Sequence, residues 1–85
     1  MWNDRLRIAA SVEADWRALT PAERNVATEA LRTIDDDPII GAPLFEPLKG
    51  LWSYRPENLR IVYRIVTEGR YVMILGITRV INSAT

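Results

Sequence analysis

Residues 59–66 read L-R-I-V-Y-R-I-V, and this stretch decides the fold class. It is rich in β-branched and aromatic residues, which favour an extended strand. Side chains alternate along a strand, so the larger apolar residues share one face: Leu59, Ile61, Tyr63 and Ile65. The other face carries Arg60 and Arg64 between two valines. We therefore expect a sheet with one face against a helical layer and the other face exposed.

Two more strands are predicted around this one. Residues 51–55 and 71–77 are also dominated by apolar and aromatic side chains. Pro56-Glu57-Asn58 and Glu68-Gly69 supply turn residues between the three segments. The last third of the chain is thus predicted to form antiparallel strands joined by hairpins.

The first half of the chain indicates a short strand and two helices. Residues 5–9 alternate, and residues 12–19 have helical spacing, with Ser11 as the expected N-cap. Thr20-Pro21-Ala22-Glu23 is a capping box that begins a second helix. That helix should end at about residues 34–36, because three aspartates and Pro38 follow.

The aspartates are interpreted as a solvated helix end rather than a metal site. The loop over residues 39–50 should tuck Leu44, Phe45 and Leu48 against the core. The predicted fold is α+β in the order β-α-α-β-β-β. It is one domain over residues 1–85, with a helical hairpin packed on a small antiparallel sheet.

The composition narrows the possible chemistry. Eleven Lys and Arg balance eleven Asp and Glu, so the formal net charge is zero. This argues against coating nucleic acid by bulk charge, but not against a local basic patch. The absence of Cys and His excludes a thiol nucleophile and the commonest general base and metal ligand. We expect no metal site, no cofactor and no membrane span, in a cytoplasmic protein.

The hairpin turns predict how the strands align. A two-residue turn at Glu68-Gly69 places Arg60 opposite Ile77 and Arg79 opposite Asn58. Arg60 and Arg79 then lie on the same exposed side of the sheet, as diagonal neighbours.

The other hairpin sets Arg55 opposite Arg60 as well, while Trp52 and Tyr54 point to the core. The exposed face should then collect basic and aromatic side chains: Arg55, Arg60, Arg64, Arg79 and Tyr71, with Lys49 nearby. Like charges opposite one another in a sheet cost about 0.2–1 kcal/mol per pair. Polyanion binding would explain why the arginines gather on this face, since guanidinium groups pair with phosphate. Spacing alone favours an ordinary solvated face that protects the sheet from aggregation.

Residues 47–65, P-L-K-G-L-W-S-Y-R-P-E-N-L-R-I-V-Y-R-I, resemble the C-terminal half of RelE/ParE superfamily toxins. Those toxins typically show L-x-G-x-W-x-x-R-x-x-x-x-R-x-x-Y. A hydrophobic strand that ends near an arginine follows, as residues 72–79 do here. Residues 37–44, D-P-x-x-G-x-P-L, also resemble the family's loop between elements. The likeness covers nearly the whole chain.

The resemblance implies a type II toxin that an antitoxin wraps and neutralises, with any oligomer formed through the antitoxin. In the RelE-like branch it implies ribosome-dependent cleavage of mRNA, in which the RNA 2′-hydroxyl attacks the adjacent phosphate. Cations stabilise the transition state of such reactions. The resemblance assigns catalysis to Arg60 and Arg79. It matches Lys49 and Arg55 to basic positions that are more variable, and we expect both to bind substrate. Arg64 and Tyr71 are added as expected substrate-binding residues because the predicted register places them on the same face.

Two features depart from the RelE-like pattern. Residues 80–85 contain no Tyr or His after the last arginine, and the chain is neutral whereas ribosome-directed members tend to be basic. Two alternatives therefore stay open. One is a ParE-like toxin that binds DNA gyrase without nuclease chemistry, and the other is a catalytically silent module that binds the antitoxin.

Overall fold

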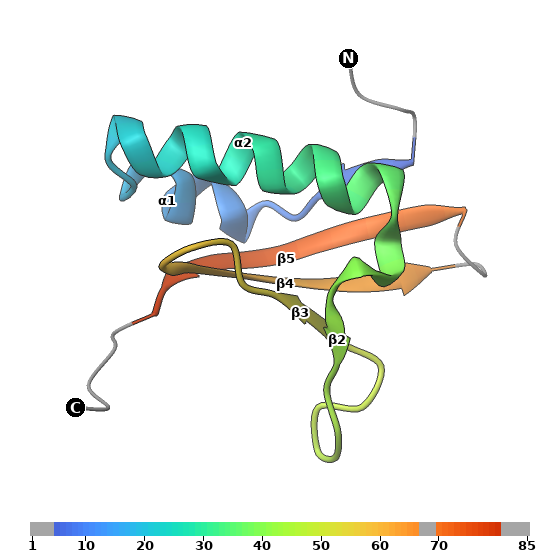
Figure 1. Cartoon of the computed structure of the whole chain (residues 1–85). Coiled ribbons are helices and arrows are strands. Elements are labelled where there is room, and N and C mark those ends of the chain that lie inside the picture. Colours follow the sequence, from blue (N-terminus) through green and yellow to red (C-terminus); the bar gives the residue numbers. More distant parts are fainter. Residues whose placement is uncertain (1–4, 67–69, 81–85) are drawn as a thin grey trace.

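A computed structural model describes residues 5–66 and 70–80, in which two helices pack on one face of a five-stranded sheet (Figure 1). The elements are β1 (Leu6–Ile8), α1 (Ser11–Arg17), α2 (Pro21–Asp36), a 3-10 turn (Pro38–Ile40), β2 (Ala42–Pro43), β3 (Trp52–Tyr54), β4 (Leu59–Val66) and β5 (Tyr71–Arg79). The order across the sheet is β1-β5-β4-β3-β2. The predicted α+β class is confirmed. The sheet is mixed rather than antiparallel, because β1 runs parallel to β5, and it includes the short extra strand β2.

Strand β4 shows the alternation that its sequence predicts. Leu59, Ile61 and Tyr63 are 0% exposed, whereas Arg60 and Arg64 on the other face are exposed. The buried face of β4 belongs to the same apolar core as α1 and α2. Both helices lie on that side of the sheet, and in the described part of the chain the opposite face carries no helix (Figure 1).

Helix α2 begins as predicted, at a capping box. The Thr20 Oγ1 accepts a hydrogen bond from the Glu23 N–H at 3.1 Å, and the Glu23 Oε1 accepts one from the Thr20 N–H at 2.8 Å. These reciprocal bonds satisfy two backbone donors that a helix start otherwise leaves without partners. The apolar stripe of the helix is buried: Ala27, Ala30, Leu31 and Ile34. In the described part of the chain, neither helix has the length and hydropathy that crossing a bilayer requires.

Helix α1 begins differently from the prediction. Ala10, rather than Ser11, occupies the N-cap position, and it makes no side-chain capping bond. The Ser11 hydroxyl instead donates to the backbone carbonyl of Leu75 in β5, at 3.3 Å. The Ser11 hydroxyl, which the local sequence predicts to cap α1, therefore bonds to the sheet instead.

The aspartates that end α2 have different environments. Asp36 and Asp37 are exposed, as expected, but Asp35 is only 2% exposed, so the predicted solvated run is wrong at this residue. Asp35 lies on the buried side of α2 next to Ile34, and its backbone carbonyl accepts a hydrogen bond from Arg5 at 3.0 Å. Among the described residues, no three His, Cys, Asp or Glu side chains are grouped to hold a metal ion.

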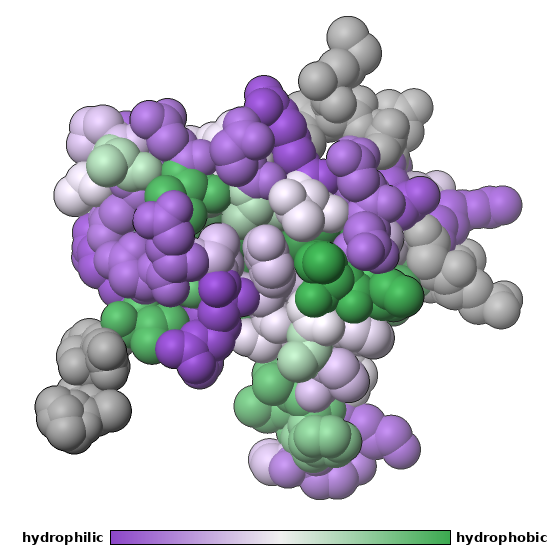
Figure 2. All heavy atoms as spheres, viewed as in Figure 1, coloured by the Kyte–Doolittle hydropathy of each residue, from purple (hydrophilic) through white to green (hydrophobic). Residues whose placement is uncertain are grey.

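The segment between β2 and β3 projects away from the sheet on the side opposite the helices (Figure 1). Phe45 is 82% exposed and Leu48 is 50% exposed, so the prediction that they pack on the core is wrong. Backbone hydrogen bonds close the segment on itself, from Leu44 N–H to the Leu51 carbonyl and from Leu48 N–H to the Phe45 carbonyl, both 2.8 Å. Apolar surface consequently lies on this projecting loop (Figure 2).

Tyr63 connects the middle of the sheet to the segment before β2. Its hydroxyl donates to the Pro38 carbonyl at 2.7 Å and accepts from the Gly41 N–H at 3.2 Å. Burial raises the pKa of this hydroxyl above its ordinary value of 10.0. A Cβ at Gly41 would lie 2.6 Å from the Tyr63 hydroxyl and 2.7 Å from the Ser53 carbonyl, so this close approach requires glycine.

Candidate nucleic-acid interface

A β-bulge in β5 changes the register of the sheet. Val62 pairs with Gly76, but the next residue of β4, Tyr63, pairs with Ile74. Leu75 is therefore an extra residue that has no partner on β4. Because side chains alternate, one extra residue reverses the face of every β5 side chain beyond it.

Helix α1 holds this bulge through two side chains. The Asp15 Oδ2 accepts a hydrogen bond from the Ile77 N–H at 3.0 Å, and the Ser11 hydroxyl donates to the Leu75 carbonyl. A Cβ at Gly76 would lie 3.6 Å from the Asp15 Oδ2, at ordinary van der Waals distance, so the helix and the strand are in contact here. Two backbone groups at the bulge thus find hydrogen-bond partners on α1.

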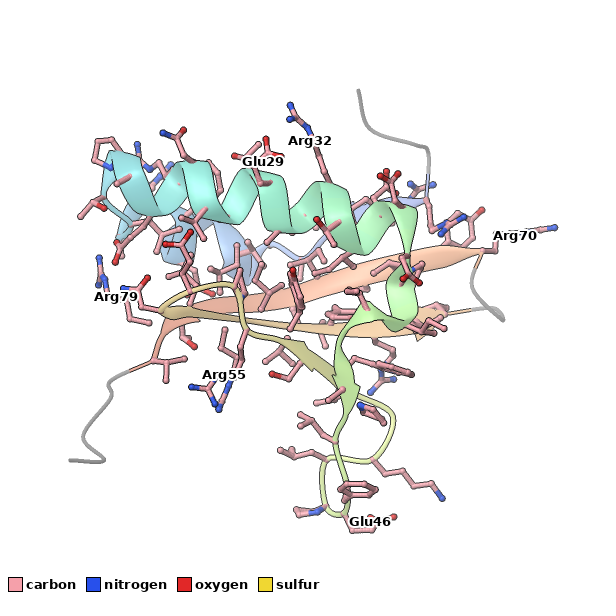
Figure 3. All side chains as sticks on the ribbon, in the orientation of Figure 1. Glu29, Arg32, Glu46, Arg55, Arg70 and Arg79 are labelled. Atoms are coloured by element: carbon pink, nitrogen blue, oxygen red, sulfur yellow. The ribbon has the colours of Figure 1, made fainter. Side chains whose placement is uncertain are left out.

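Arg79 lies on the helix side of the sheet. Its Nε and Nη2 donate to the Glu23 carboxylate at 2.6 and 2.7 Å, and Nη2 also donates to the Ala18 carbonyl at 2.7 Å. In Figure 3, Arg79 points toward the helical layer, whereas Arg55 points away from it. The expectation that Arg60 and Arg79 share one surface is wrong, because the bulge reverses the face of Arg79.

The predicted strand partners beyond the bulge are also one residue out of place. Arg60 pairs with Thr78 rather than Ile77, and Arg79 pairs with Leu59 rather than Asn58. Gly76 is the feature of the sequence that could have predicted the bulge, because a glycine inside a strand often marks one. The turn at residues 67–69, on which the prediction was based, lies outside the described residues.

The pair of Glu23 and Arg79 fastens β5 to the start of α2. Hydrogen bonds from the Arg79 guanidinium and the Thr20 backbone lower the pKa of Glu23 from 4.5 to about 2. The hydrogen-bonded carboxylate in turn raises the pKa of Arg79. The Glu23 side chain is 13% exposed and the Arg79 side chain 46% exposed, so water partly screens the pair. Any catalytic role of Arg79 stays a prediction, separate from the surface described next.

The face of the sheet turned away from the helices, here called the open face, carries the other predicted arginines. Its described strand residues, identified from the pairing, are Arg7, Ala42, Ser53, Arg60, Val62, Arg64, Val66, Tyr71, Met73, Gly76 and Thr78. None of these is Asp or Glu. Arg55 directly follows β3, and continuing the ladder from the pair Tyr54 and Ile61 sets it opposite Arg60, as predicted. Lys49 is exposed on the projecting loop.

Arginines on the two sides of the sheet differ in their partners. Around the helices, arginine side chains pair with carboxylates, as in Arg17–Glu13, Arg32–Glu29 and Arg79–Glu23. Within the described part of the chain, Arg55, Arg60 and Arg64 make no hydrogen bond or ion pair. An exposed guanidinium without a protein partner keeps its planar set of donors for a phosphate or carboxylate ligand.

Arg7 belongs to the open face but was not predicted. Strand β1 pairs with β5 so that Arg7 lies opposite Met73, and Met73 lies opposite Arg64 on β4. The Arg7 guanidinium lies over the Tyr71 ring, 4.7 Å from its centroid. Alternation within residues 5–9 indicated which side Arg7 would take. No pattern in the sequence indicated that β1 would lie beside β5.

An apolar groove lies between β1 and α1, on the other side of the sheet. Its volume is about 450 Å³, and it is lined by Ile8, Ala9, Ala10, Val12, Glu13, Trp16, Leu31 and Ile77. Ile8 is 51% exposed at the rim, and Trp16 is half-buried. Groups of exposed apolar side chains on a small protein often mark a surface that a partner covers.

No protein-family model and no curated protein matches this sequence. Solved structures do match it. A chain of the toxin–antitoxin complex RelBE2 from Mycobacterium tuberculosis is 28% identical, with a TM-score of 0.81. The match covers 88% of this chain and 95% of that chain.

Two further toxins share the fold at lower identity. The isolated RelE toxin of E. coli is 20% identical with a TM-score of 0.74, over 93% of this chain and 86% of that chain. The YoeB/ParE toxin from Agrobacterium tumefaciens is 23% identical with a TM-score of 0.73, over 88% and 96% respectively. These matches cover most of each chain, so the α+β arrangement as a whole is shared, as the sequence resemblance predicts.

Proposed function

We propose that this chain, which has the RelE/ParE-like toxin fold, is the toxin of a type II toxin–antitoxin pair and binds RNA on its open face. The toxin role is supported by the structural neighbours and by the motif over residues 47–65. RNA binding is supported by one observation above the others. Arg55, Arg60 and Arg64 lie on a sheet face without carboxylates among its described strand residues, and they have no partner there.

Arg60 is the central residue of the proposed RNA site. It lies on β4, the central strand of the five-stranded sheet, opposite Thr78, with Arg55 expected on its other side. Neighbouring strands are roughly 5 Å apart, so two guanidinium groups can approach one phosphate from adjacent strands. A phosphate between Arg55 and Arg60 would offset the repulsion between these like charges.

We further propose that the bound RNA is mRNA on the ribosome and that it is cleaved next to Arg60. The RNA 2′-oxygen forms a bond to the adjacent phosphorus while the bond from phosphorus to the 5′-oxygen breaks. The products are a 2′,3′-cyclic phosphate and a 5′-hydroxyl. The Arg60 guanidinium stabilises the negative charge that develops on the phosphoryl oxygens. The 2′-hydroxyl gives its proton to water and the 5′-oxygen takes a proton from water. We assign neither transfer to a residue of this chain, which contains no His.

The position of Arg79 favours a second function, that of a ParE-like toxin that binds DNA gyrase without nuclease chemistry. Of the two arginines assigned to catalysis by the resemblance, only Arg60 lies on the open face, since Arg79 pairs with Glu23 on the helix side. Electrostatic stabilisation by one catalytic cation is weaker than stabilisation by two. The open face would then contact an acidic protein surface.

We propose that the antitoxin binds the apolar groove between β1 and α1. The groove exposes Ile8 at its rim and leaves Trp16 half-buried, so an apolar segment of the antitoxin would remove this surface from water. Oligomers would then form through the antitoxin. Substituting Ile8→Asp should weaken antitoxin binding without changing toxicity in cells that lack the antitoxin.

Expression in bacteria tests these functions together. Wild-type protein should stop growth and produce mRNA fragments with 5′-hydroxyl ends, while Arg60→Gln should remove both effects. Arg32→Gln, on the exposed side of α2, is the matched control and should leave them unchanged. Growth arrest with a DNA damage response and intact mRNA would support the gyrase alternative. No growth effect would support the silent antitoxin-binding module, and full toxicity of Arg60→Gln would rule out the open face as the active surface.

A further inference from the structure

We infer that Arg7 is a second phosphate-binding residue on the open face and that Tyr71 positions it, so that bound RNA extends from Arg60 to strand β1. This inference rests on the proposed RNA binding, and it adds a residue outside the motif that carries the family resemblance. The site has two parts. One is a cation at the edge of the sheet, and the other is an aromatic ring that holds this cation in place.

The sheet register places Arg7 in line with the arginines of β4. Arg7 and Arg64 lie on either side of Met73, two strand spacings or roughly 10 Å apart. Arg60 lies four residues farther along β4, or roughly 13 Å from Arg64. These three cations therefore trace a path that is too long for one phosphate group. A single-stranded RNA that follows the path would place successive phosphates near different arginines.

Two contacts with described residues help to hold the Arg7 side chain. Its guanidinium lies 4.7 Å from the Tyr71 ring centroid, and its Nη1 donates to the Leu6 carbonyl at 3.1 Å. A guanidinium stacked on a ring keeps donors at its edge, where a phosphate can approach in its plane. Restricting the side chain before binding lowers the entropy lost when phosphate binds. Tyr71 is 37% exposed, so the pair lies at the surface where a ligand can reach it.

Charge on the open face favours RNA as the ligand. Its described strand residues carry Arg7, Arg60 and Arg64 without any Asp or Glu, although the chain as a whole is neutral. Binding of a single-stranded polyanion to such a surface weakens with salt, with a slope set by the number of phosphates contacted. The competing explanation is that Arg7 only protects the edge strand from pairing with another chain. That explanation predicts no change in RNA binding when Arg7 is replaced.

The test compares RNA affinities by fluorescence anisotropy with a labelled single-stranded decanucleotide at several salt concentrations. Arg7→Gln should weaken binding about threefold to tenfold and reduce the salt slope by about 0.7. Arg7→Lys should keep most of the salt slope, because it retains the charge. Arg17→Gln, an exposed residue of α1 that pairs with Glu13, is the matched control and should bind as the wild type does. Thermal unfolding of each variant checks that the fold is retained.

A short ligand separates the two parts of the path. A dinucleotide with one internal phosphate cannot reach both Arg60 and Arg7, so Arg7→Gln should leave its affinity at the Arg60 site unchanged in an NMR titration. The decanucleotide should bind Arg7→Gln clearly more weakly than it binds the wild type. Equal loss with both ligands would mean that Arg7 acts on the whole fold, and the second subsite would be wrong.

Substitutions of Tyr71 test its positioning role. Tyr71→Leu should weaken decanucleotide binding less than Arg7→Gln, and adding it to Arg7→Gln should cause no further loss. Tyr71→Phe keeps the ring and should bind as the wild type does. A further loss in the double variant would mean that Tyr71 contacts RNA directly, and the positioning role would be wrong.

Failure of the subsite can be told from failure of the proposed function. If Arg64→Gln weakens binding while Arg7→Gln does not, the open face binds RNA but the inference about Arg7 is wrong. If wild-type protein does not bind the decanucleotide even at low salt, both the inference and the proposed RNA binding are wrong.

Discussion

The two faces of the sheet use charged side chains differently. On the covered face, Asp15 bonds to the Ile77 backbone of β5, and Arg79 pairs with Glu23 of α2. On the open face of the same sheet, Arg60 and Arg64 find no partner in the described part of the chain. Both faces contain arginines, so residue type alone does not distinguish them.

The difference lies in what surrounds each arginine. Helix α2 supplies Glu23 on the covered side, whereas the described strand residues of the open face include no carboxylate. The chain has zero net charge, so its total charge does not point to a surface that binds anions. The arginines that lack carboxylate partners do point to one. We therefore expect substitutions on the covered face to change stability and substitutions on the open face to change binding.

The largest effect on stability should come from the covered face. Ile61 is 0% exposed, and Ile61→Ala should lower the free energy of unfolding by about 2–5 kcal/mol because it leaves a cavity. Arg60→Ala, one residue away on the open face, should change it by no more than about 0.5 kcal/mol. Urea denaturation measures both values. A loss for Arg60→Ala as large as that for Ile61→Ala would break the distinction between the faces.

A smaller loss is expected where α1 holds the bulge. Asp15→Ala should lower the free energy of unfolding by about 1–3 kcal/mol, because the Ile77 N–H loses its acceptor. Asp15→Asn keeps an acceptor oxygen and should cost less. Hydrogen exchange at the Ile77 amide gives a local measurement and should speed up in Asp15→Ala. Unchanged exchange there would show that the bulge does not depend on α1.

Acid should weaken the contact between β5 and α2. The pKa of Glu23 is about 2 in the folded protein and has an ordinary value of 4.5, so its contribution to stability is complete above about pH 4.5. It is lost as the pH falls from 4.5 toward 2. Glu23→Gln should therefore lower the melting temperature at pH 6, and the difference from wild type should shrink toward pH 2. Arg79→Gln breaks the same pair and should reduce the pH dependence in the same window. A difference that stays constant across this window would contradict the assignment.

The smallest effect on stability, with the opposite sign, is expected on the open face. Arg60→Gln should raise the free energy of unfolding by about 0.2–0.5 kcal/mol, because it removes repulsion from Arg55 on the neighbouring strand. The same variant should lose RNA binding, so a single substitution should raise stability and remove function. Chemical denaturation and RNA binding on the same samples provide the comparison. A clear loss of stability would mean that Arg60 has a structural role.

Local sequence predicted the features that depend on near neighbours. The capping box of Thr20 and Glu23 and the alternation of β4 appear as expected, since each needs only residues close in the chain. The positions of Phe45 and Leu48 were wrong, because apolar character does not show whether a loop folds back on the core. For the predicted site, Arg55, Arg60, Arg64 and Tyr71 share the open face, while Lys49 lies on the projecting loop and Arg79 on the helix side.

Local sequence is sufficient to predict that β4 buries one face and exposes Arg60 and Arg64 on the other, because side-chain alternation is a property of any strand. The face on which Arg79 lies and the neighbours of Arg7 follow from the three-dimensional fold. The face of Arg79 depends on one extra residue in β5 at a bulge that α1 holds. Arg7 joins the open face because β1 lies parallel to β5, a strand from the other end of the chain. Both outcomes depend on contacts between distant segments, which alternation along a single strand does not specify.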